Sequence, residues 1–311
     1  MKLAMVFPGQ GSQSVGMLKA YGSLPGVAEV RAEAAQALGA EFLHLLDEGP
    51  ADQLDLTVNT QPAMLTAGVA AYRAWISLGG PEPELVAGHS LGEYSALVAA
   101  GALTLAQALP LVRFRAQCMQ EAVPQGVGAM AAILNLDDDA VRAACAEAAH
   151  GEVVQAVNFN APGQVVIAGH KAAVARAIDA CKARGAKRAL PLPVSAPFHS
   201  ALMQPAAERL KSYLQSVALA APRIALVNNV DVREERDAAC IRDALVRQAA
   251  APVRWVETIR HLAARGVTHV VECGPGKVLA GLVKRIDGKL QGLALADAAS
   301  LEQALAAVRA A

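Results

Sequence analysis

Ser90 stands in a short stretch whose residue types suit a nucleophile, Gly88-His89-Ser90-Leu91-Gly92. The apolar run at residues 85–87 predicts the end of a buried strand, and an Ala/Leu-rich helical pattern follows the stretch at once. This is the Gly-x-Ser-x-Gly arrangement in its strand–turn–helix context. So sharp a turn needs flanking residues that lack a Cβ atom. The pattern predicts that the Ser90 hydroxyl stands clear of the backbone at a helix N-terminus, where a developing negative charge is favoured.

A serine nucleophile needs a base within hydrogen-bonding reach, and the chain has seven histidines. His199 is the best candidate, because Pro197 stiffens the loop before it and a helical pattern begins just after it. His89 adjoins the serine, but neighbours on a tight turn usually point apart, so it is a poor base. The remaining five occupy ordinary positions within or at the ends of predicted elements: His44, His150, His170, His261 and His269.

Seven motifs occur in order along the chain: Gly9-Gln10-Gly11-Ser12-Gln13, Thr60-Gln61-Pro62-Ala63, Gly88-His89-Ser90-Leu91-Gly92-Glu93, Arg115 with Met119-Gln120-Glu121, Asn158-Phe159-Asn160, Phe198-His199 and Gly274-Pro275-Gly276. Together they resemble the malonyl-CoA:acyl carrier protein transacylases of type II fatty acid synthesis. The resemblance covers essentially the whole chain.

The resemblance implies a role for each matching residue of the reaction centre. Ser90 would attack the malonyl thioester, with His199 as general base and then general acid. The backbone N–H of Leu91 and the amide region of Gln10 would form the oxyanion hole. No acidic residue that could be the third member of a catalytic triad is evident near His199. The family orients its histidine through a main-chain carbonyl instead, and Gln248 is the matching position.

The resemblance also implies how the acyl group is recognised. Arg115 would pair with the free malonyl carboxylate, since a planar guanidinium suits two carboxylate oxygens; without the resemblance it reads as an ordinary arginine on a helix surface. Phe198 resembles the malonyl-selective members and would disfavour an α-methyl branch. Ala116 departs from the commonest pattern, in which glycine follows the arginine. Three further residues would line the site: Gln61, His89 and Asn158.

The implied reaction is ping-pong acyl transfer. Malonyl-CoA acylates Ser90, CoA leaves, and the phosphopantetheine thiol of an acidic acyl carrier protein takes the malonyl group. The thioester of malonyl-CoA, the ester on Ser90 and the thioester on the carrier are nearly equal in free energy. We therefore expect neither a metal ion nor a tightly bound cofactor.

Three competing interpretations stay open from the residues. A serine esterase or thioesterase also uses Gly-x-Ser-x-Gly, although Arg115 and the absence of a downstream acid-then-histidine order argue against it. A transacylase subunit of malonate decarboxylase or a free-standing polyketide acyltransferase would keep the fold and change the pathway. A carrier-binding scaffold without catalysis conflicts with the intact Ser90, His199 and Arg115.

The whole chain sets broader limits. Its 311 residues carry 28 Lys and Arg against 28 Asp and Glu, so no global field favours nucleic acid. The five cysteines are widely spaced, which argues against a disulfide framework and a zinc site and favours the cytoplasm.

The N-terminal apolar run is too short for a signal peptide. Residues 94–112 carry no formal charge, but Gly101 as a helix C′ residue and Thr104 as an N-cap predict two buried helices rather than a membrane span.

The element pattern predicts an α/β fold in two parts. Residues 1–125 and 193–311 would form a large α/β catalytic domain, and the resemblance implies an α/β-hydrolase-like parallel sheet. Residues 126–192 read as β-α-β-β-α-β, the order of a ferredoxin-like unit, and would be an inserted subdomain. Within the large domain, residues 27–46 read as one helix, and Thr60 with Pro62 predicts the start of another at residues 60–62.

A local basic cluster interrupts the otherwise neutral chain in the predicted insert, at Lys182, Arg184, Lys187 and Arg188. The ordinary explanation is a solvated face. The sharper one is that the Lys187/Arg188 face docks an acidic acyl carrier protein. For the protein itself we expect a monomer.

Overall fold

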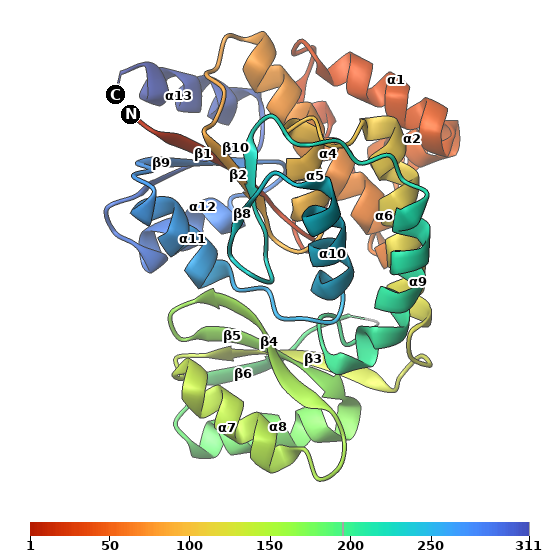
Figure 1. Ribbon diagram of the computed structural model, residues 1–311, viewed down its shortest axis with the longest axis vertical. Helices are drawn as coiled ribbons and strands as arrows, with labels where there is room; N and C mark the ends of the chain where they lie inside the picture. The colour runs from red at the N-terminus through yellow and green to blue at the C-terminus, as the bar shows by residue number, and fades with distance from the viewer. Residues whose placement is uncertain (195, 311) are drawn as a thin grey trace.

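The computed structural model describes residues 1–194 and 196–310. In this part of the chain the strands form two separate sheets (Figure 1). The larger has six strands in the order β10-β9-β1-β2-β7-β8, and all pairs are parallel except β7 with β8. Its strands are β1 (Leu3–Phe7), β2 (Leu85–Gly88), β7 (Ala225–Val227), β8 (Glu234–Glu235), β9 (His269–Cys273) and β10 (Gln291–Leu295).

Both faces of this sheet are buried, as expected for parallel strands. Leu3, Met5 and Phe7 of β1 belong to the core on one face, while Ala4 and Val6 belong to the core on the other. The first core is covered by α1 (Val27–Leu38), α2 (Ala40–Glu48), α3 (Ala51–Leu54), α4 (Thr57–Ser77), α5 (Gly92–Ala99), α6 (Leu105–Glu121), α9 (Gln204–Gln215), α10 (Ala238–Gln248) and α13 (Ala298–Arg309). The second is covered by α11 (Trp255–Ala264) and α12 (Val278–Ile286).

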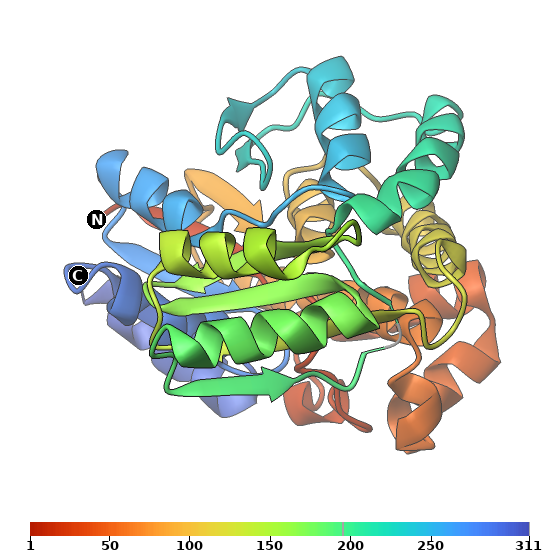
Figure 2. The same cartoon turned by 90° about the horizontal axis from the view of Figure 1, so that it is seen from below.

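The smaller sheet is antiparallel, in the order β4-β5-β3-β6. Its elements are β3 (Gly128–Leu134), α7 (Asp138–Ala148), β4 (Val154–Ala161), β5 (Gln164–His170), α8 (Lys171–Ala183) and β6 (Arg188–Pro191). Helices α7 and α8 cover the face of this sheet that points away from the larger body (Figures 1 and 2). The chain order and strand order are those of the predicted ferredoxin-like unit.

Parallel pairing brings two predicted motifs together at one edge of the large sheet. Phe7 is paired with Gly88 at the carboxyl ends of β1 and β2. The glycine-rich turn after Phe7 and the Ser90 turn after Gly88 therefore leave the sheet side by side, which is the usual position of ligand sites in parallel sheets.

Two predictions about helices are wrong. The single helix over residues 27–46 is two, α1 and α2, because Gly39 adopts a φ of 91° between them. Helix α4 begins at Thr57 rather than at residues 60–62. Thr60 does not cap this helix; its hydroxyl donates back to the carbonyls of Leu54 and Leu56.

The two helices predicted for residues 94–112 are confirmed. Helix α5 ends before Gly101, whose φ is 75°, and Thr104 caps α6 through a reciprocal pair of hydrogen bonds with Gln107. Across the described residues, no helix is both long and apolar enough to cross a membrane.

Candidate active site

The Ser90 turn is held by close backbone packing. Ser90 has a φ of 52°, a left-handed conformation that non-glycine residues seldom adopt. A Cβ atom on Gly88 would lie 1.9 Å from the carbonyl carbon of Gly92, and one on Gly92 would lie 1.9 Å from the carbonyl oxygen of Phe7. The two glycines therefore let the start of α5 pack directly against β1 and β2, as the sequence predicts.

His199 makes the hydrogen bond to the nucleophile. The Ser90 Oγ and His199 Nε2 atoms are 2.7 Å apart, and His199 Nδ1 lies 2.9 Å from the main-chain oxygen of Gln248. A carbonyl only accepts, so Nδ1 carries the proton and Nε2 is free to accept the one from Ser90. Burial, reinforced by the positive charge of Arg115, lowers the pKa of His199 to about 3. The imidazole is therefore neutral in the free protein.

Arg115 is buried beside both groups, with 1% of its surface exposed. Its Nη1 donates to Gln61 Oε1 at 2.7 Å, and its Nη2 donates to Gln248 Oε1 at 2.9 Å and to Ser90 Oγ at 3.2 Å. The guanidinium also lies 5.4 Å from the centre of the Tyr94 ring. Among the described residues no carboxylate forms an ion pair with it. A buried guanidinium in this position can receive a carboxylate from outside the chain.

Glu93 and Asn229 support the turn from behind. Glu93 Oε2 accepts hydrogen bonds from the Asn229 backbone N–H at 3.1 Å and from Gln248 Nε2 at 3.0 Å. Asn229 in turn accepts from the Ser90 N–H at 2.8 Å and donates to the Gly88 carbonyl at 2.6 Å. Burial raises the pKa of Glu93 to about 7. The sequence motifs predict a role for neither residue.

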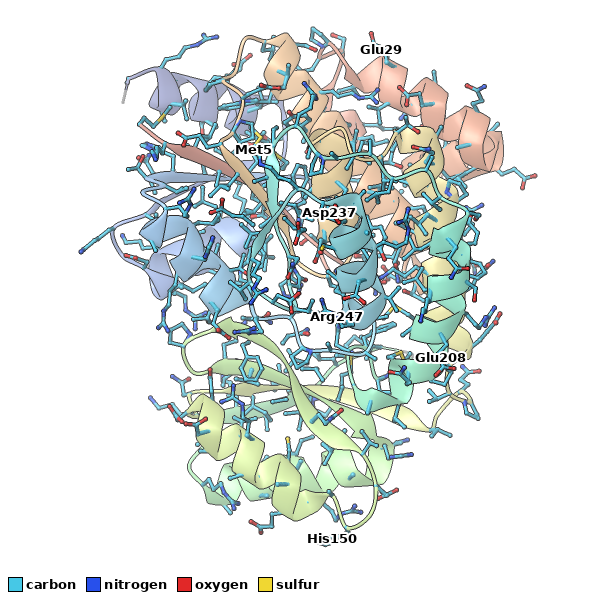
Figure 3. The ribbon with its side chains drawn as sticks, in the orientation of Figure 1. Met5, Glu29, His150, Glu208, Asp237 and Arg247 are labelled. Atoms are coloured by element: carbon cyan, nitrogen blue, oxygen red, sulfur yellow. The ribbon has the colours of Figure 1, made fainter. Side chains whose placement is uncertain are left out.

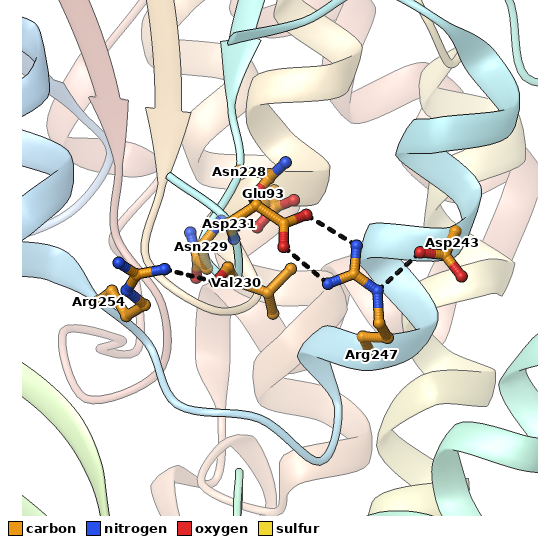
Figure 4. Close-up of polar contacts among 8 residues, drawn as sticks. All are labelled: Glu93, Asn228, Asn229, Val230, Asp231, Asp243, Arg247 and Arg254. Atoms are coloured by element: carbon orange, nitrogen blue, oxygen red, sulfur yellow. Dashed lines mark hydrogen bonds and ion pairs between the residues drawn. The ribbon is translucent and has the colours of Figure 1, made fainter. Parts of the chain in front are cut away.

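An ion-pair network fixes the loop that carries Asn229 (Figure 4). Arg247 forms two hydrogen bonds with the carboxylate of Asp231, at 2.9 and 2.7 Å, and another with Asp243 at 2.6 Å. Arg254 donates to the main-chain oxygen of Val230 at 3.0 Å. Since Arg247 adjoins Gln248, the same network steadies the segment whose carbonyl faces His199.

The two predicted oxyanion donors lie at this edge of the sheet. Within the described residues the Leu91 backbone N–H, at the start of α5, has no acceptor. The Gln10 side chain accepts a short hydrogen bond from the Thr57 hydroxyl, and its amide N–H₂ has no acceptor among residues 1–194 and 196–310. Both N–H groups are therefore available to an acceptor from outside the described residues.

A cavity of about 810 Å³ opens beside these groups. It is lined by residues of the turns after β1 and β2, of β4 and β5, and of α12. Four of the predicted site residues are among them: Gln10, His89, Asn158 and Phe198. His89 does not bond to the serine; its Nε2 lies 2.8 Å from Asn160 Oδ1 and its ring lies 5.5 Å from that of Trp255. Burial lowers the pKa of His89, so it too is neutral.

The other histidines lie elsewhere. His170 accepts from the Val153 backbone N–H, His261 pairs with Glu234, and His269 contacts Thr268. His150 lies at the far tip of the smaller unit (Figure 3). Across residues 1–194 and 196–310, no group of three or more His, Cys, Asp or Glu side chains is arranged to hold a metal ion.

This fold, with a serine on a strand–turn–helix, a neutral histidine bonded to it and an arginine beside both, defines the class: an α/β protein equipped for acyl transfer through serine. The family described as acyl transferase domain matches residues 4–296. The chain is 57% identical over 305 residues to the malonyl CoA-acyl carrier protein transacylase of Salmonella typhimurium, with 98% of this chain and 99% of that protein covered.

Solved structures agree. The acyl-carrier-protein S-malonyltransferase of Burkholderia pseudomallei 1710b matches with a TM-score of 0.96 at 64% identity, covering 98% of this chain and 100% of that one. A malonyl-transacylase solved in complex with its type II PKS acyl-carrier protein matches with a TM-score of 0.97 at 52% identity, covering 99% and 100%. The chain belongs to the malonyl-CoA:acyl carrier protein transacylase family, and the predicted fold class is confirmed.

Proposed function

We propose that this chain transfers a malonyl group from CoA to the phosphopantetheine thiol of an acyl carrier protein, through an ester on Ser90. The observation that carries the proposal is the position of Arg115, whose Nη2 lies 3.2 Å from Ser90 Oγ. In a malonyl group one methylene separates the reacting carbonyl from the free carboxylate. A guanidinium this close to the nucleophile suits a short acyl group with a terminal carboxylate.

The first half-reaction begins when His199 Nε2 takes the Ser90 proton as the oxygen bonds to the thioester carbonyl carbon. The Leu91 N–H and the Gln10 amide stabilise the resulting oxyanion; losing one such donor typically costs about 3 kcal/mol. When the C–S bond breaks, His199 returns the proton to the sulfur and CoA leaves. His89, Asn158 and Phe198 line the cavity, and the buried Gln61 orients Arg115 by accepting from its Nη1.

The second half-reaction reverses these steps with a different thiol. The phosphopantetheine thiol gives its proton to His199 and attacks the ester, and Ser90 recovers the proton as the C–O bond breaks. Arg115 holds the malonyl carboxylate throughout, so that the ester carbonyl meets a positioned thiol rather than a stray water. Each half-reaction balances without an oxidant, a reductant or a metal ion.

Intact-protein mass spectrometry after mixing with malonyl-CoA tests the proposal, followed by addition of holo carrier protein. We expect a malonyl adduct on the wild type that is absent in Ser90→Ala, and an acylation rate on the order of 100-fold lower in Arg115→Ala. Arg113→Ala is the matched control, because Arg113 lies on the same helix and packs over Phe42. Release of free malonate without a lasting adduct would indicate a hydrolase instead.

The carrier protein of type II fatty acid synthesis is the proposed acceptor. The relative that was solved with a type II PKS acyl-carrier protein favours a second candidate, transfer to a polyketide carrier. Comparing kcat/KM for the two kinds of holo carrier from the same organism separates them. A preference for the polyketide carrier would overturn the first assignment.

We also propose that the Lys187/Arg188 face docks the acidic carrier. Both side chains are exposed on or beside β6, and this strand leads to Leu192 and Pro193 at the cavity.

We further propose that the protein is a cytoplasmic monomer without a tightly bound cofactor. Four of its five free cysteines are buried, which suits a reducing compartment. A mass by light scattering well above 32.1 kDa would contradict the monomer.

A further inference from the structure

The carboxylate of Glu93 lies one amide group away from Arg115. Gln248 Nε2 donates to Glu93 Oε2 at 3.0 Å, and Oε1 of the same amide accepts from Arg115 Nη2 at 2.9 Å. All three side chains are buried, with at most 1% of their surface exposed. A buried positive charge, an amide and a buried carboxylate thus follow one another in a single line of contacts.

The Gln248 amide fits this line in one orientation only. A guanidinium has donors alone, so it requires the amide oxygen, whereas an ionised carboxylate only accepts and requires the amide NH₂ group. The second N–H of that group donates to the Ser90 main-chain oxygen at 2.9 Å. The amide therefore presents the negative end of its dipole to Arg115 and the positive end to Glu93, which stabilises both charges in the interior.

This separation leaves the guanidinium without a direct ionic partner. In residues 1–194 and 196–310 Arg115 forms no ion pair, although a buried charge without compensation is strongly unfavourable. Burial raises the pKa of Glu93 to about 7, and the positive charge of Arg115 acts in the opposite direction, so the two charges interact across the amide. A carboxylate in direct contact would instead occupy the donors that an acyl carboxylate needs.

We propose that Glu93 is a positioning residue for acyl selectivity: it holds Arg115 in place as a counter-charge across the Gln248 amide and leaves the guanidinium free for the carboxylate of the acyl group. This inference rests on the proposed function, because it concerns how the same site selects a malonyl group. Glu93 acts through Gln248 rather than on a reacting atom. Its support of the Ser90 turn through Asn229 is a separate role, which would affect every reagent at Ser90 alike.

Two rates separate these roles. Acylation of Ser90 by malonyl-CoA needs the carboxylate contact, whereas labelling of Ser90 by a small uncharged phosphonofluoridate needs only the nucleophile and its base. Both rates are measured at about pH 8, where the Glu93 carboxylate is ionised. Glu93→Met keeps the length of the side chain and removes both oxygens. In this variant we expect the ratio of malonyl acylation to labelling to fall at least about tenfold.

Ser95→Ala is the matched control. Ser95 is buried in the same helix as Glu93, and its hydroxyl has no hydrogen-bond partner in the described part of the chain. The ratio in this control should therefore equal that of the wild type.

An exchange of the two side chains tests the separation directly. Glu93→Gln/Gln248→Glu keeps the net charge but places the carboxylate beside Arg115, in the direct ion pair that the wild type lacks. The ratio of malonyl acylation to labelling should fall on the order of 100-fold, as in Arg115→Ala. A wild-type ratio in the exchange variant would overturn the inference, and so would equal losses of both rates in Glu93→Met. Should Glu93→Met not fold, the exchange variant decides alone.

The two proposals fail in different ways. Absence of a malonyl adduct on the wild-type Ser90 would overturn the proposed function. A normal wild-type adduct, with a ratio that neither variant lowers, would overturn only the assignment of Glu93.

Discussion

His199, the base in the proposed reaction, lies beside the positive charge of Arg115. Burial is the larger cause of its low pKa, and Arg115 is the second. A histidine is active as a base only above its pKa, so the wild-type serine should react at a constant rate down to about pH 5. In Arg115→Met the pKa of His199 rises toward its ordinary value, and the loss of reactivity on acidification should begin at higher pH.

Labelling of Ser90 by a small uncharged phosphonofluoridate measures this shift, because such a reagent needs the base and not the carboxylate contact. Arg113→Met serves as the control, since it removes a charge from the same helix away from His199. Superimposable pH profiles for wild type and Arg115→Met would show that Arg115 does not govern the titration of His199.

The sequence reveals those site residues that carry a local signature. Ser90 follows from its glycines and His199 from its position after Pro197, whereas Arg115 reads as a surface residue unless the family is known. Asn229 was missed because its contact with Ser90 spans 139 positions, and no local pattern announces it. Its only signal is that the pair Asn228-Asn229 directly follows the apolar run at residues 224–227.

At the level of elements, the site depends on how closely α5 approaches β1. A Cβ atom on Gly92 would lie 1.9 Å from the Phe7 carbonyl oxygen and 2.7 Å from its carbon, and backbone cannot move aside as a side chain would. Gly92→Ala should therefore lower the free energy of unfolding by at least about 2 kcal/mol and separate Gln10 from Ser90.

Urea unfolding followed by circular dichroism, together with the rate of Ser90 labelling, checks this prediction. Gly281→Ala is the matched control: Gly281 is exposed within α12 and nothing lies within 4 Å of its added Cβ. This control should gain about 0.5–1 kcal/mol, because alanine favours a helix interior. Equal effects of the two substitutions would contradict the role assigned to Gly92.

Elements are predictable where their ends are marked locally. Asp137 caps α7 by accepting from the Asp139 N–H, and the β-α-β-β-α-β order predicted for residues 126–192 is the order of β3, α7, β4, β5, α8 and β6. The start of α4 was placed too late because Thr60 has the residue type of a cap. Its hydroxyl instead bonds backward to carbonyls of the preceding turn, a choice that depends on where Leu54 and Leu56 lie in the folded chain.

At the scale of the whole molecule, the site lies where the two sheets meet. The Val253 N–H donates to the Val157 carbonyl at 2.8 Å, and the Phe159 N–H donates to the Val253 carbonyl at 3.0 Å, so β4 is tied to the larger body. One apolar cluster draws on both parts, with Met119 from α6 and Val157 from β4 among its members. Such tertiary packing decides where Asn158 and Phe198 stand relative to Ser90, and no sequence pattern specifies it.

Charge is also organised at this scale. The chain has no net charge, yet neither Lys187 nor Arg188 forms an ion pair with any described residue, whereas Arg184 nearby is paired with Glu147. Unpaired exposed cations remain free to attract an acidic partner, and such attraction weakens with salt. Lys187→Glu/Arg188→Glu should raise the KM for holo carrier protein about tenfold, on the order of 1.4 kcal/mol, and leave the KM for malonyl-CoA unchanged.

Steady-state kinetics at low and high salt tests this docking face. The matched control is Lys2→Glu/Arg236→Glu, which changes the net charge by the same amount. Lys2 and Arg236 line a second cavity near the amino ends of β1 and β2, whereas Ser90 follows the carboxyl end of β2. A local docking face predicts that only the first pair raises the KM for the carrier and that salt narrows the difference. If both pairs raise it equally, overall charge rather than the Lys187/Arg188 face governs the encounter; if neither does, the carrier docks elsewhere.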